Sequence, residues 1–361
     1  MIDYEKVKKS LLKELYTLNP EILSKFSVVT MFEFIMDHTL VIPDINAFVN
    51  DMKRIIKQGG GELPLPRQSL HRGGGGANVA SGLGKLGLST YFIGRTNILG
   101  KSLLDFFFNE HNVNIDYVKI DGNLGLTLAL EVGDEKTNIM VGDLDSYSEL
   151  NFTHLTPEDL ELISKCNLVG IFNWTLNKTG TELAEGIFSY IKKFKTLTYL
   201  DTGDPNFRTG DIKKLHEKVI SSPYLDIFSV NENELNSYCN FISDSKRVAK
   251  TIDKALLLKK SIHAKLDLHA SSFAASFIDD KAYFAPVFKI KPLKKTGAGD
   301  SWNTGNILGY FLKLEPEQRL MLSNGLACCY ISSYSSAHPD LNKLCEFIAS
   351  TPFEEMDYKN A

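Results

Sequence analysis

The sequence predicts an α/β fold with a mainly parallel central sheet, helices on both faces of that sheet and a small lid element. Apolar strand-like runs alternate with helical patterns along most of the chain, which is typical of βαβ units. Polar residues directly follow several of these runs, at the carboxyl ends of strands where ligands bind in parallel sheets. The polar residues concerned are Asp37, Asn173, Asp204 and Asn231.

Composition limits the classes of protein that the chain can belong to. Its 361 residues are 43% hydrophobic, enough for one large domain, and its net charge of −4 argues against a nucleic-acid-binding protein. Apolar runs are too short to span a membrane, and the five cysteines show neither a CxxC pair nor metal-ligand spacing. We therefore expect a cytoplasmic protein with reduced thiols and with no nucleic-acid or membrane partner.

The elements follow one another in a regular order after an N-terminal extension. Residues 1–25 are expected to be helical, because Leu11, Leu12, Leu15 and Leu18 recur at helical spacing. Residues 26–350 are expected to form one domain and residues 351–361 a C-terminal tail. The predicted strands cover 26–36, 89–94, 166–174, 196–201, 226–231, 264–270 and 275–278, and helices are predicted within 78–87, 181–194 and 232–241.

Two segments interrupt the alternation and are interpreted as the lid and its insertion, at about 40–72 and 125–145. The first contains a helical stretch followed by "GGGELPLPRQSLHR", and it lies between the first strand and the next helix. In the second, "VGDEKTNIMV" follows an apolar run, which predicts a hairpin rather than a crossover.

The stretch "KKTGAGDSWNTG" at 294–305 predicts a glycine-rich turn that begins a helix. Backbone N–H groups at a helix N-terminus attract anions, and the small Gly297, Ala298 and Gly299 would let a phosphate approach closely. Asp300 would lie beside that anion and could accept the proton of a substrate hydroxyl. Alternatively, Asp300 only caps the helix.

A second glycine-rich stretch, "RGGGGANVASGLGKLG" at 72–87, leads into a helix with a face of small residues. Glycines permit close approach of a ligand to the backbone, and Asn78 offers both a donor and an acceptor in the first turn. A flexible loop before a tightly packed helix would give the same pattern. Dinucleotide binding is disfavoured, because no clear strand precedes the glycines and no acidic residue closes a second strand.

Taken together, these motifs resemble the ribokinase-like (PfkB-type) carbohydrate kinase family from about residue 26 to about residue 335. The resemblance implies the ribokinase-like three-layer fold. The matching positions are Gly73, Gly74, Ala77 and Asn78 in GG-x-x-A-N, Thr296 to Asp300 in the glycine-rich turn, Asp37, "DPNFR" at 204–208, "NENE" at 231–234 and Asn324.

The resemblance also implies an activity, the transfer of the terminal phosphoryl group of ATP to a hydroxyl of a sugar, polyol or nucleoside. Asp300 would be the catalytic base, the backbone of 297–299 the anion hole, and Asn231 and Glu234 would order Mg²⁺ through water. Acceptor contacts would be Asp37, Gly73, Gly74, Asn78 and Asn173, and nucleotide contacts Thr296, Gly297, Gly299, Asn324 and His269.

Departures from the family pattern leave alternatives open. Lys294 and Lys295 stand where the family has Asp-Thr, whose aspartate helps to build a monovalent-cation site, so K⁺ binding is expected to be lost there. The lysine charge could replace the ion by supporting the anion hole directly, and two solvated lysines are the alternative interpretation. His269 lies where most members have a glycine-containing nucleotide loop, which keeps ADP possible as donor.

The alternative function is that of a ligand-binding protein without turnover. Family members often pair through lid strands, which makes a homodimer possible.

Overall fold

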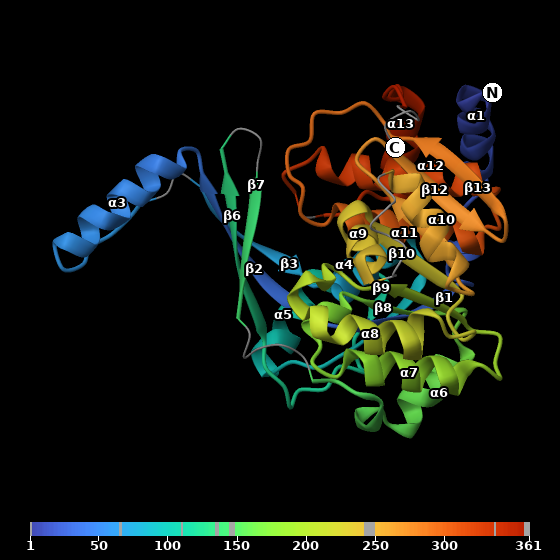
Figure 1. The fold of residues 1–361 in the computed structure, drawn as a ribbon, viewed down its shortest axis with the longest axis horizontal. Coiled ribbons are helices and arrows are strands. Elements are labelled where there is room, and N and C mark those ends of the chain that lie inside the picture. Colours follow the sequence, from blue (N-terminus) through green and yellow to red (C-terminus); the bar gives the residue numbers. More distant parts are fainter. Residues whose placement is uncertain are drawn as a thin grey trace.

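A nine-stranded sheet lies at the centre of the molecule (Figure 1). The computed structural model describes residues 2–64, 67–109, 111–133, 137–143, 149–241, 250–335 and 337–356. The strand order is β13-β12-β11-β10-β9-β8-β1-β4-β5, and only the β11–β12 and β12–β13 pairs within it are antiparallel. The strands are β1 (Ser27–Phe32), β4 (Ser89–Gly94), β5 (Val113–Asn114), β8 (Leu168–Phe172), β9 (Leu197–Asp201), β10 (Ile227–Asn231), β11 (Lys265–His269), β12 (Phe273–Ile278) and β13 (Lys281–Pro286).

Helices cover both faces of this sheet, so the predicted three-layer α/β fold is confirmed. One face carries α6 (Pro157–Lys165), α7 (Gly180–Ile191), α8 (Ile212–Leu215), α9 (Glu232–Phe241) and α10 (Thr251–Lys260). The other carries α1 (Tyr4–Leu15), α4 (Gly75–Leu86), α11 (Ala298–Phe311), α12 (Pro316–Ile331) and α13 (Leu341–Ser350). Shorter or peripheral elements are α2 (Pro20–Leu23), α5 (Ile98–Phe108), the 3₁₀ turns η2 (Phe152–His154), η3 (Trp174–Leu176) and η4 (Pro205–Asp211), and the π-helical turn η5 (His216–Ile220).

The apolar runs of the central strands follow from burial on both faces. On β1, Val29 and Met31 pack into the core beneath α6–α10, whereas Val28 packs into the core beneath α4, α11 and α12. Successive strand residues point to opposite faces, so a strand covered on both sides needs apolar residues at nearly every position. At the N-terminus, Leu11 and Leu15 of α1 are fully buried against the second of these cores.

A smaller sheet stands beside the main body, contains most of the segments predicted as the lid and is here called the lid sheet. Its strands are ordered β3-β2-β6-β7. They are β2 (Ile35–Ile42), β3 (Gln68–Gly73), β6 (Gly125–Val132) and β7 (Thr137–Gly142). The antiparallel β6–β7 pair confirms the predicted hairpin. Helix α3 (Ile45–Lys57) follows β2 and projects away from the body as an arm (Figure 1), with none of its residues buried.

The prediction of one strand over 26–36 is wrong. The chain leaves the main sheet after Phe32 and enters the lid sheet at Ile35, so the run contains the end of β1 and the start of β2. Periodicity could not separate the two strands, because both are largely apolar. The break coincides with Glu33, whose side chain turns inward to accept a hydrogen bond from the N–H of Gly75. None of the described helices is long and apolar enough to cross a membrane.

Candidate active site

A cavity of about 380 Å³ lies where the carboxyl ends of the main strands face the lid. All four polar residues predicted to follow strands line this cavity, although Asp37 comes from lid strand β2 rather than from the end of β1. The cavity therefore brings together residues that are far apart in the sequence. The predicted site residues that line it are Asp37, Gly74, Asn78, Asn173, Asn231, Glu234, His269, Thr296, Gly297, Ala298, Gly299 and Asp300.

Helix α11 begins at the cavity, as the glycine-rich turn predicts. Its N-cap is Gly297, which has a left-handed backbone (φ 80°) and supplies no capping side chain. A side chain at this position would be strained, and its Cβ would lie 2.9 Å from Cε1 of Tyr330. The turn thus presents the positive end of the α11 dipole to the cavity, an arrangement suited to holding a phosphate.

Asp300 lies in the first turn of α11 and is oriented by Asn78. The side-chain amide of Asn78 donates to Oδ2 of Asp300 at 2.8 Å, while its Oδ1 accepts from Nε of Arg72 at 3.1 Å. Asn78, predicted as an acceptor contact, therefore also positions the predicted base. Burial raises the pKa of Asp300 to about 7, partly offset by this hydrogen bond. A carboxylate with a pKa near neutrality is well matched to general-base catalysis.

Two further buried carboxyl groups adjoin Asp300. Burial, together with the charge of Asp300, raises the pKa of Asp37 to about 7. Burial also raises the pKa of Glu33 to about 8, against the hydrogen bonds that Glu33 accepts from Gly75 and Asn173. Those hydrogen bonds both reach Oε1 of Glu33, and its buried Oε2 has no hydrogen-bond partner among the described residues. Glu33, Asp37 and Asp300 are thus carboxyl groups of the cavity wall that can hold protons near neutral pH.

The glycines before α4 allow close packing at the same wall. A Cβ on Gly74, which has φ 89°, would lie 2.7 Å from the carbonyl oxygen of Glu33. A Cβ on Gly73 would lie 2.4 Å from Oδ2 of Asp37. Gly73 does not itself line the cavity; its contribution is the space that it leaves for Asp37.

Asn324, like Gly73, is a predicted site residue that does not line the cavity. It lies within α12 and is buried. Its Oδ1 accepts from Nε1 of Trp302 at 2.9 Å, and its Nδ2 donates to the carbonyl of Pro286 at 2.9 Å. Both ends of the amide are used within the protein, and the nucleotide contact of Asn324 stays a prediction.

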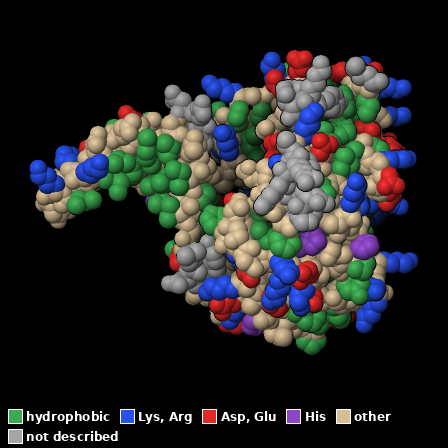
Figure 2. All heavy atoms as spheres, in the orientation of Figure 1, with side chains coloured by type: hydrophobic (Ala, Val, Ile, Leu, Met, Phe, Trp, Pro, Cys, Tyr) green, Lys and Arg blue, Asp and Glu red, His purple; other side chains and the backbone are tan. Residues whose placement is uncertain are grey.

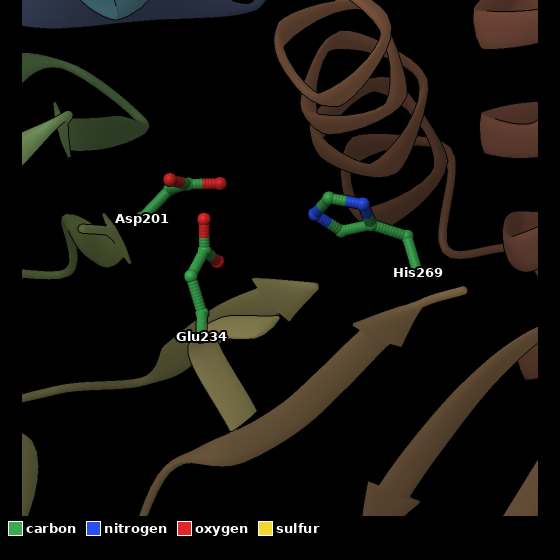
Figure 3. Close-up of side chains that lie close together, drawn as sticks. All are labelled: Asp201, Glu234 and His269. Carbon is green, nitrogen blue, oxygen red and sulfur yellow. The ribbon is translucent and has the colours of Figure 1, made fainter. Parts of the chain in front are cut away.

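Asn231 and Glu234, the predicted metal residues, form a compact unit at the end of β10. The backbone N–H and the side-chain amide of Asn231 donate to the two carboxylate oxygens of Glu234 at 2.9 and 2.7 Å. Oδ1 of Asn231 accepts from the N–H groups of Asn233 and Glu234. Asn231 thus holds Glu234 in place, and Glu234 lies with Asp201 and His269 in one cluster (Figure 3).

Lys294 is partly buried beside the cavity rather than solvated. Its Nζ donates to the carbonyl of Ser335 at 2.6 Å and lies 3.5 Å from the ring centroid of Tyr330. Burial, followed by the charge of Arg72, lowers the pKa of Lys294 to about 7. These contacts disagree with a solvated lysine at position 294, whereas Lys295 is exposed as the alternative interpretation expects.

Sequence reasoning missed three charged residues that line the cavity: Glu33, Asp201 and Arg95. A carboxylate inside the apolar run "VVTMFEFIM" was the available signal for Glu33, because burial of an unpaired acid needs a reason. Asp201 ends the apolar run "TLTYLD" in the same way that Asp204 and Asn231 follow theirs. Arg95, which pairs with Asp121, gives no comparable signal.

A family model for the pfkB family of carbohydrate kinases matches residues 37–343. The chain belongs to this family. Its membership confirms the resemblance inferred from the motifs and makes the chain a carbohydrate kinase.

Curated relatives and solved structures agree with this assignment. The chain is 25% identical over 293 residues to the 5-dehydro-2-deoxygluconokinase of Clostridium botulinum, covering 76% of this chain and 83% of that protein. It is 26% identical over 296 residues to 5-dehydro-2-deoxygluconokinase 2 of Bacillus cereus, covering 73% and 80%.

Among solved structures, Arabidopsis thaliana ribokinase complexed with ribose and ATP has a TM-score of 0.69 at 18% identity, covering 90% of this chain and 98% of that one. The 2-dehydro-3-deoxygluconokinase of Thermotoga maritima has a TM-score of 0.70 at 16% identity, covering 90% and 100%. At these identities the structural likeness shows the ribokinase-like fold.

Proposed function

We propose that this carbohydrate kinase transfers the terminal phosphoryl group of ATP to a hydroxyl of a sugar or sugar acid, with polyols and nucleosides as further acceptor classes. The observation that carries the proposal is the position of Asp300 in the first turn of α11, beside the uncapped N-terminus of that helix and held by Asn78. This arrangement puts a proton acceptor next to an anion site in one cavity.

In the proposed mechanism, Asp300 removes the proton of the attacking hydroxyl. The N–H groups of Gly297, Ala298 and Gly299 hold the charge of the transferring phosphoryl group, and Thr296 contacts the nucleotide. Asp37, Asn78 and Asn173, which line the same cavity as Asp300, bind the acceptor hydroxyls. The amide of Asn78 bridges Asp300 and Arg72. Asn78 can also donate to an acceptor hydroxyl, because its side-chain NH2 carries two hydrogens and the hydrogen bond to Asp300 uses one of them.

The residues present fit a divalent cation. Glu234 is buried at the cavity wall and is oriented by Asn231, and carboxylate oxygens are the ligands that Mg²⁺ prefers. Mg²⁺ would neutralise the charge of the nucleotide phosphates. Asn231 would act by holding Glu234, since its own amide is already used within the protein.

The lid carries a second proposal, that two copies of the chain pair through its outer face. Strand register places Asp37 and Thr127 on the cavity side and Leu70 and Val141 on the opposite side. Leu70 is 61% exposed and Val141 52% exposed. Hydrophobic side chains also line one side of the α3 arm (Figure 2). Light scattering after size exclusion tests this: a mass of twice the chain supports pairing, and a monomer at high concentration contradicts it.

A coupled kinase assay on the purified full chain tests the proposed activity. The acceptor panel begins with 5-dehydro-2-deoxygluconate and 2-dehydro-3-deoxygluconate, the compounds in the names of the relatives. It continues with aldoses, polyols and nucleosides, each with ATP and with ADP. We expect turnover with ATP and one acceptor class. Turnover with ADP alone would correct the donor. Acceptor-induced thermal stabilisation without turnover would favour a ligand-binding protein on the kinase fold.

A further inference from the structure

A chain of hydrogen bonds connects lid strand β3 to the first turn of α11. Arg72 is the last residue but one of β3, and Asn78 lies at the start of α4. Nε of Arg72 donates to Oδ1 of Asn78 at 3.1 Å, and Nδ2 of Asn78 donates to Oδ2 of Asp300 at 2.8 Å. Arg72 does not itself line the main cavity, so this chain links a cation outside the cavity to the predicted base within it.

Arg72 determines which way the amide of Asn78 points. A guanidinium group has N–H donors and no acceptor, so the Asn78 atom that faces it must be the amide oxygen. The NH2 group of Asn78 is then directed at Asp300 and needs an acceptor there. An ionised carboxylate accepts at both oxygens, whereas a protonated one carries a donor. The arrangement therefore favours the ionised form of Asp300, which is the form that can take up a proton.

The guanidinium group of Arg72 is itself held by neighbours from other elements. Arg72 is buried, with 5% of its surface exposed. Its Nη2 lies 3.4 Å from Nδ1 of His338, and its Cζ lies 5.9 Å from the ring centroid of Phe108 in α5. The ring of His338 in turn stacks on Tyr330 of α12, with a centroid distance of 4.5 Å. A planar group packed in this way offers Asn78 a donor in one fixed direction.

The charge of Arg72 also opposes the acids that surround Asp300. Burial raises the pKa of Asp300 to about 7, and the positive charge of Arg72 acts against this. The other groups whose charges interact with that of Asp300 are acidic and come from β9, β2, α9, α12 and the residue after β1, namely Asp201, Asp37, Glu234, Tyr330 and Glu33. The basic groups around Arg72 are His71, His111, Lys294 and His338. Arg72 thus stabilises the negative charge on Asp300 both by its own charge and through Asn78.

The second carboxylate oxygen of Asp300 is left for the substrate. Among the described residues, none donates a hydrogen bond to Oδ1 of Asp300. A Cβ on Gly75 would lie 3.4 Å from this oxygen, which therefore lies beside the glycine-rich start of α4. Because Asn78 occupies Oδ2 and Asp300 lines the cavity, Oδ1 is the oxygen available to a hydroxyl.

We propose that Arg72 is a positioning residue for phosphoryl transfer, which fixes the amide of Asn78 and thereby keeps Asp300 ionised with Oδ1 free for the hydroxyl proton. The proposal rests on the proposed function, since it takes Asp300 as the base. Arg72 acts through Asn78 and through its charge, from outside the cavity in which acceptor and nucleotide would bind.

The first test is the pH dependence of kcat/KM for Arg72→Gln, which removes the charge but keeps a polar side chain at this buried position. Asp300 must be ionised to act, so kcat/KM rises with pH through the pKa of Asp300, about 7. We expect this rise to move to higher pH by about one unit, so that the loss is about fivefold at pH 7 and shrinks as the pH is raised. An unchanged pH profile would overturn the proposal, because a merely structural role lowers activity equally at every pH.

Two further variants separate the cation from the bulk of the side chain. Arg72→Lys retains the charge and a donor, and we expect its pH profile to lie within about half a unit of that of the unaltered chain. A shift as large as that of Arg72→Gln would overturn the proposal. Arg67→Gln is the matched control, since Arg67 is exposed, precedes β3 and lies over Tyr334 at 4.3 Å from the ring centroid. Its pH profile should equal that of the unaltered chain.

A titration without substrate separates this proposal from the proposed function. In ¹³C nuclear magnetic resonance of the full chain labelled at the aspartate Cγ, the signal that Asp300→Asn lacks belongs to Asp300. We expect its midpoint at about pH 7 in the unaltered chain and about one unit higher in Arg72→Gln. A shifted midpoint with no turnover of any acceptor would support the role of Arg72 and contradict the proposed function. Turnover with an unshifted midpoint would do the reverse.

Asn78→Asp keeps the proposal falsifiable if Arg72→Gln fails to fold. The new carboxylate has nearly the shape of the amide and can accept from Arg72, but it cannot donate to Asp300 and places a like charge beside it. We expect the titration midpoint of Asp300 to rise by more than about one unit. An unchanged midpoint would overturn the proposal, because the amide of Asn78 would then play no part in the ionisation of Asp300.

Discussion

Buried charged side chains are paired within the chain in one region of this molecule and lack a comparable partner in another. Beneath α11 and α12, Asp267 of β11 is paired with Arg319, whose NH1 and NH2 donate to its two oxygens at 2.9 and 3.2 Å. Asn306 donates to the same carboxylate at 2.9 Å. Burial works to raise the pKa of Asp267, but Arg319 and these hydrogen bonds outweigh it and hold the pKa below its usual range.

At the cavity, Glu33, Asp37 and Asp300 are buried without a comparable partner. Arg72 lowers the pKa values of Asp37 and Asp300 only in part, and burial raises all three. Charged groups that serve the structure are therefore neutralised within the chain, whereas those at the cavity are left for a ligand. The following predictions test this difference.

Asp300→Asn should have the largest effect. The amide cannot accept the hydroxyl proton, so kcat should fall by about 10²–10⁴-fold while acceptor binding is largely kept. Steady-state kinetics and calorimetric binding of the acceptor measure the two quantities. Asp280→Asn, at an exposed turn, is the control and should leave kcat unchanged. Near-normal turnover of Asp300→Asn would remove Asp300 from the mechanism.

Arg319→Met should act on stability instead. It leaves Asp267 buried and unpaired, which should lower the free energy of unfolding by about 3–5 kcal/mol at neutral pH. Denaturant titration measures this loss. In the double variant Arg319→Met/Asp267→Leu both charges are absent, and most of the stability should return. A single variant as stable as the unaltered chain would contradict the paired role assigned to this network.

Glu33→Gln should change the pH dependence of stability. The folded-state pKa of Glu33, about 8, lies above its ordinary value of 4.5, so the folded chain holds a proton that the unfolded chain releases between these values. Its stabilising contribution is therefore complete below pH 4.5 and is lost as pH rises through about 8.

The glutamine variant removes that dependence and should be more stable than the unaltered chain at pH 8, by about 1–3 kcal/mol. Thermal unfolding from pH 5 to pH 8 measures the slope, and Glu21→Gln on the exposed surface of α2 is the control. An unchanged slope in Glu33→Gln would show that Glu33 is already ionised in the folded chain.

Potassium should have the smallest effect. The ammonium of Lys294 already donates to the carbonyl of Ser335 and lies over Tyr330, so we expect turnover to be the same in K⁺ and in tetramethylammonium salts at equal ionic strength. Activation by K⁺ of more than about twofold would contradict the interpretation that the lysine replaces a monovalent cation.

The fold class, the two glycine-rich helix starts and the family could be predicted from the sequence alone. Neighbouring residues encode each of these features. They are a turn that requires glycine, a helix that begins at small residues, and an aspartate at a fixed position in the first turn of α11. The meeting of the polar residues that follow the strands could also be predicted, because parallel strands bring their carboxyl ends to one edge of the sheet.

The contacts that each of these residues makes depend on the tertiary structure. Asn324 was assigned to the nucleotide, yet its amide is satisfied by Trp302 and Pro286. Glu33 stands out locally as an acid in an apolar run, but the end of the strand beside it and its contact with Asn173 depend on residues distant in the chain. Hydrogen-bond partners and burial depend on residues distant in the chain, and they determine which polar groups the fold neutralises and which it leaves facing the cavity.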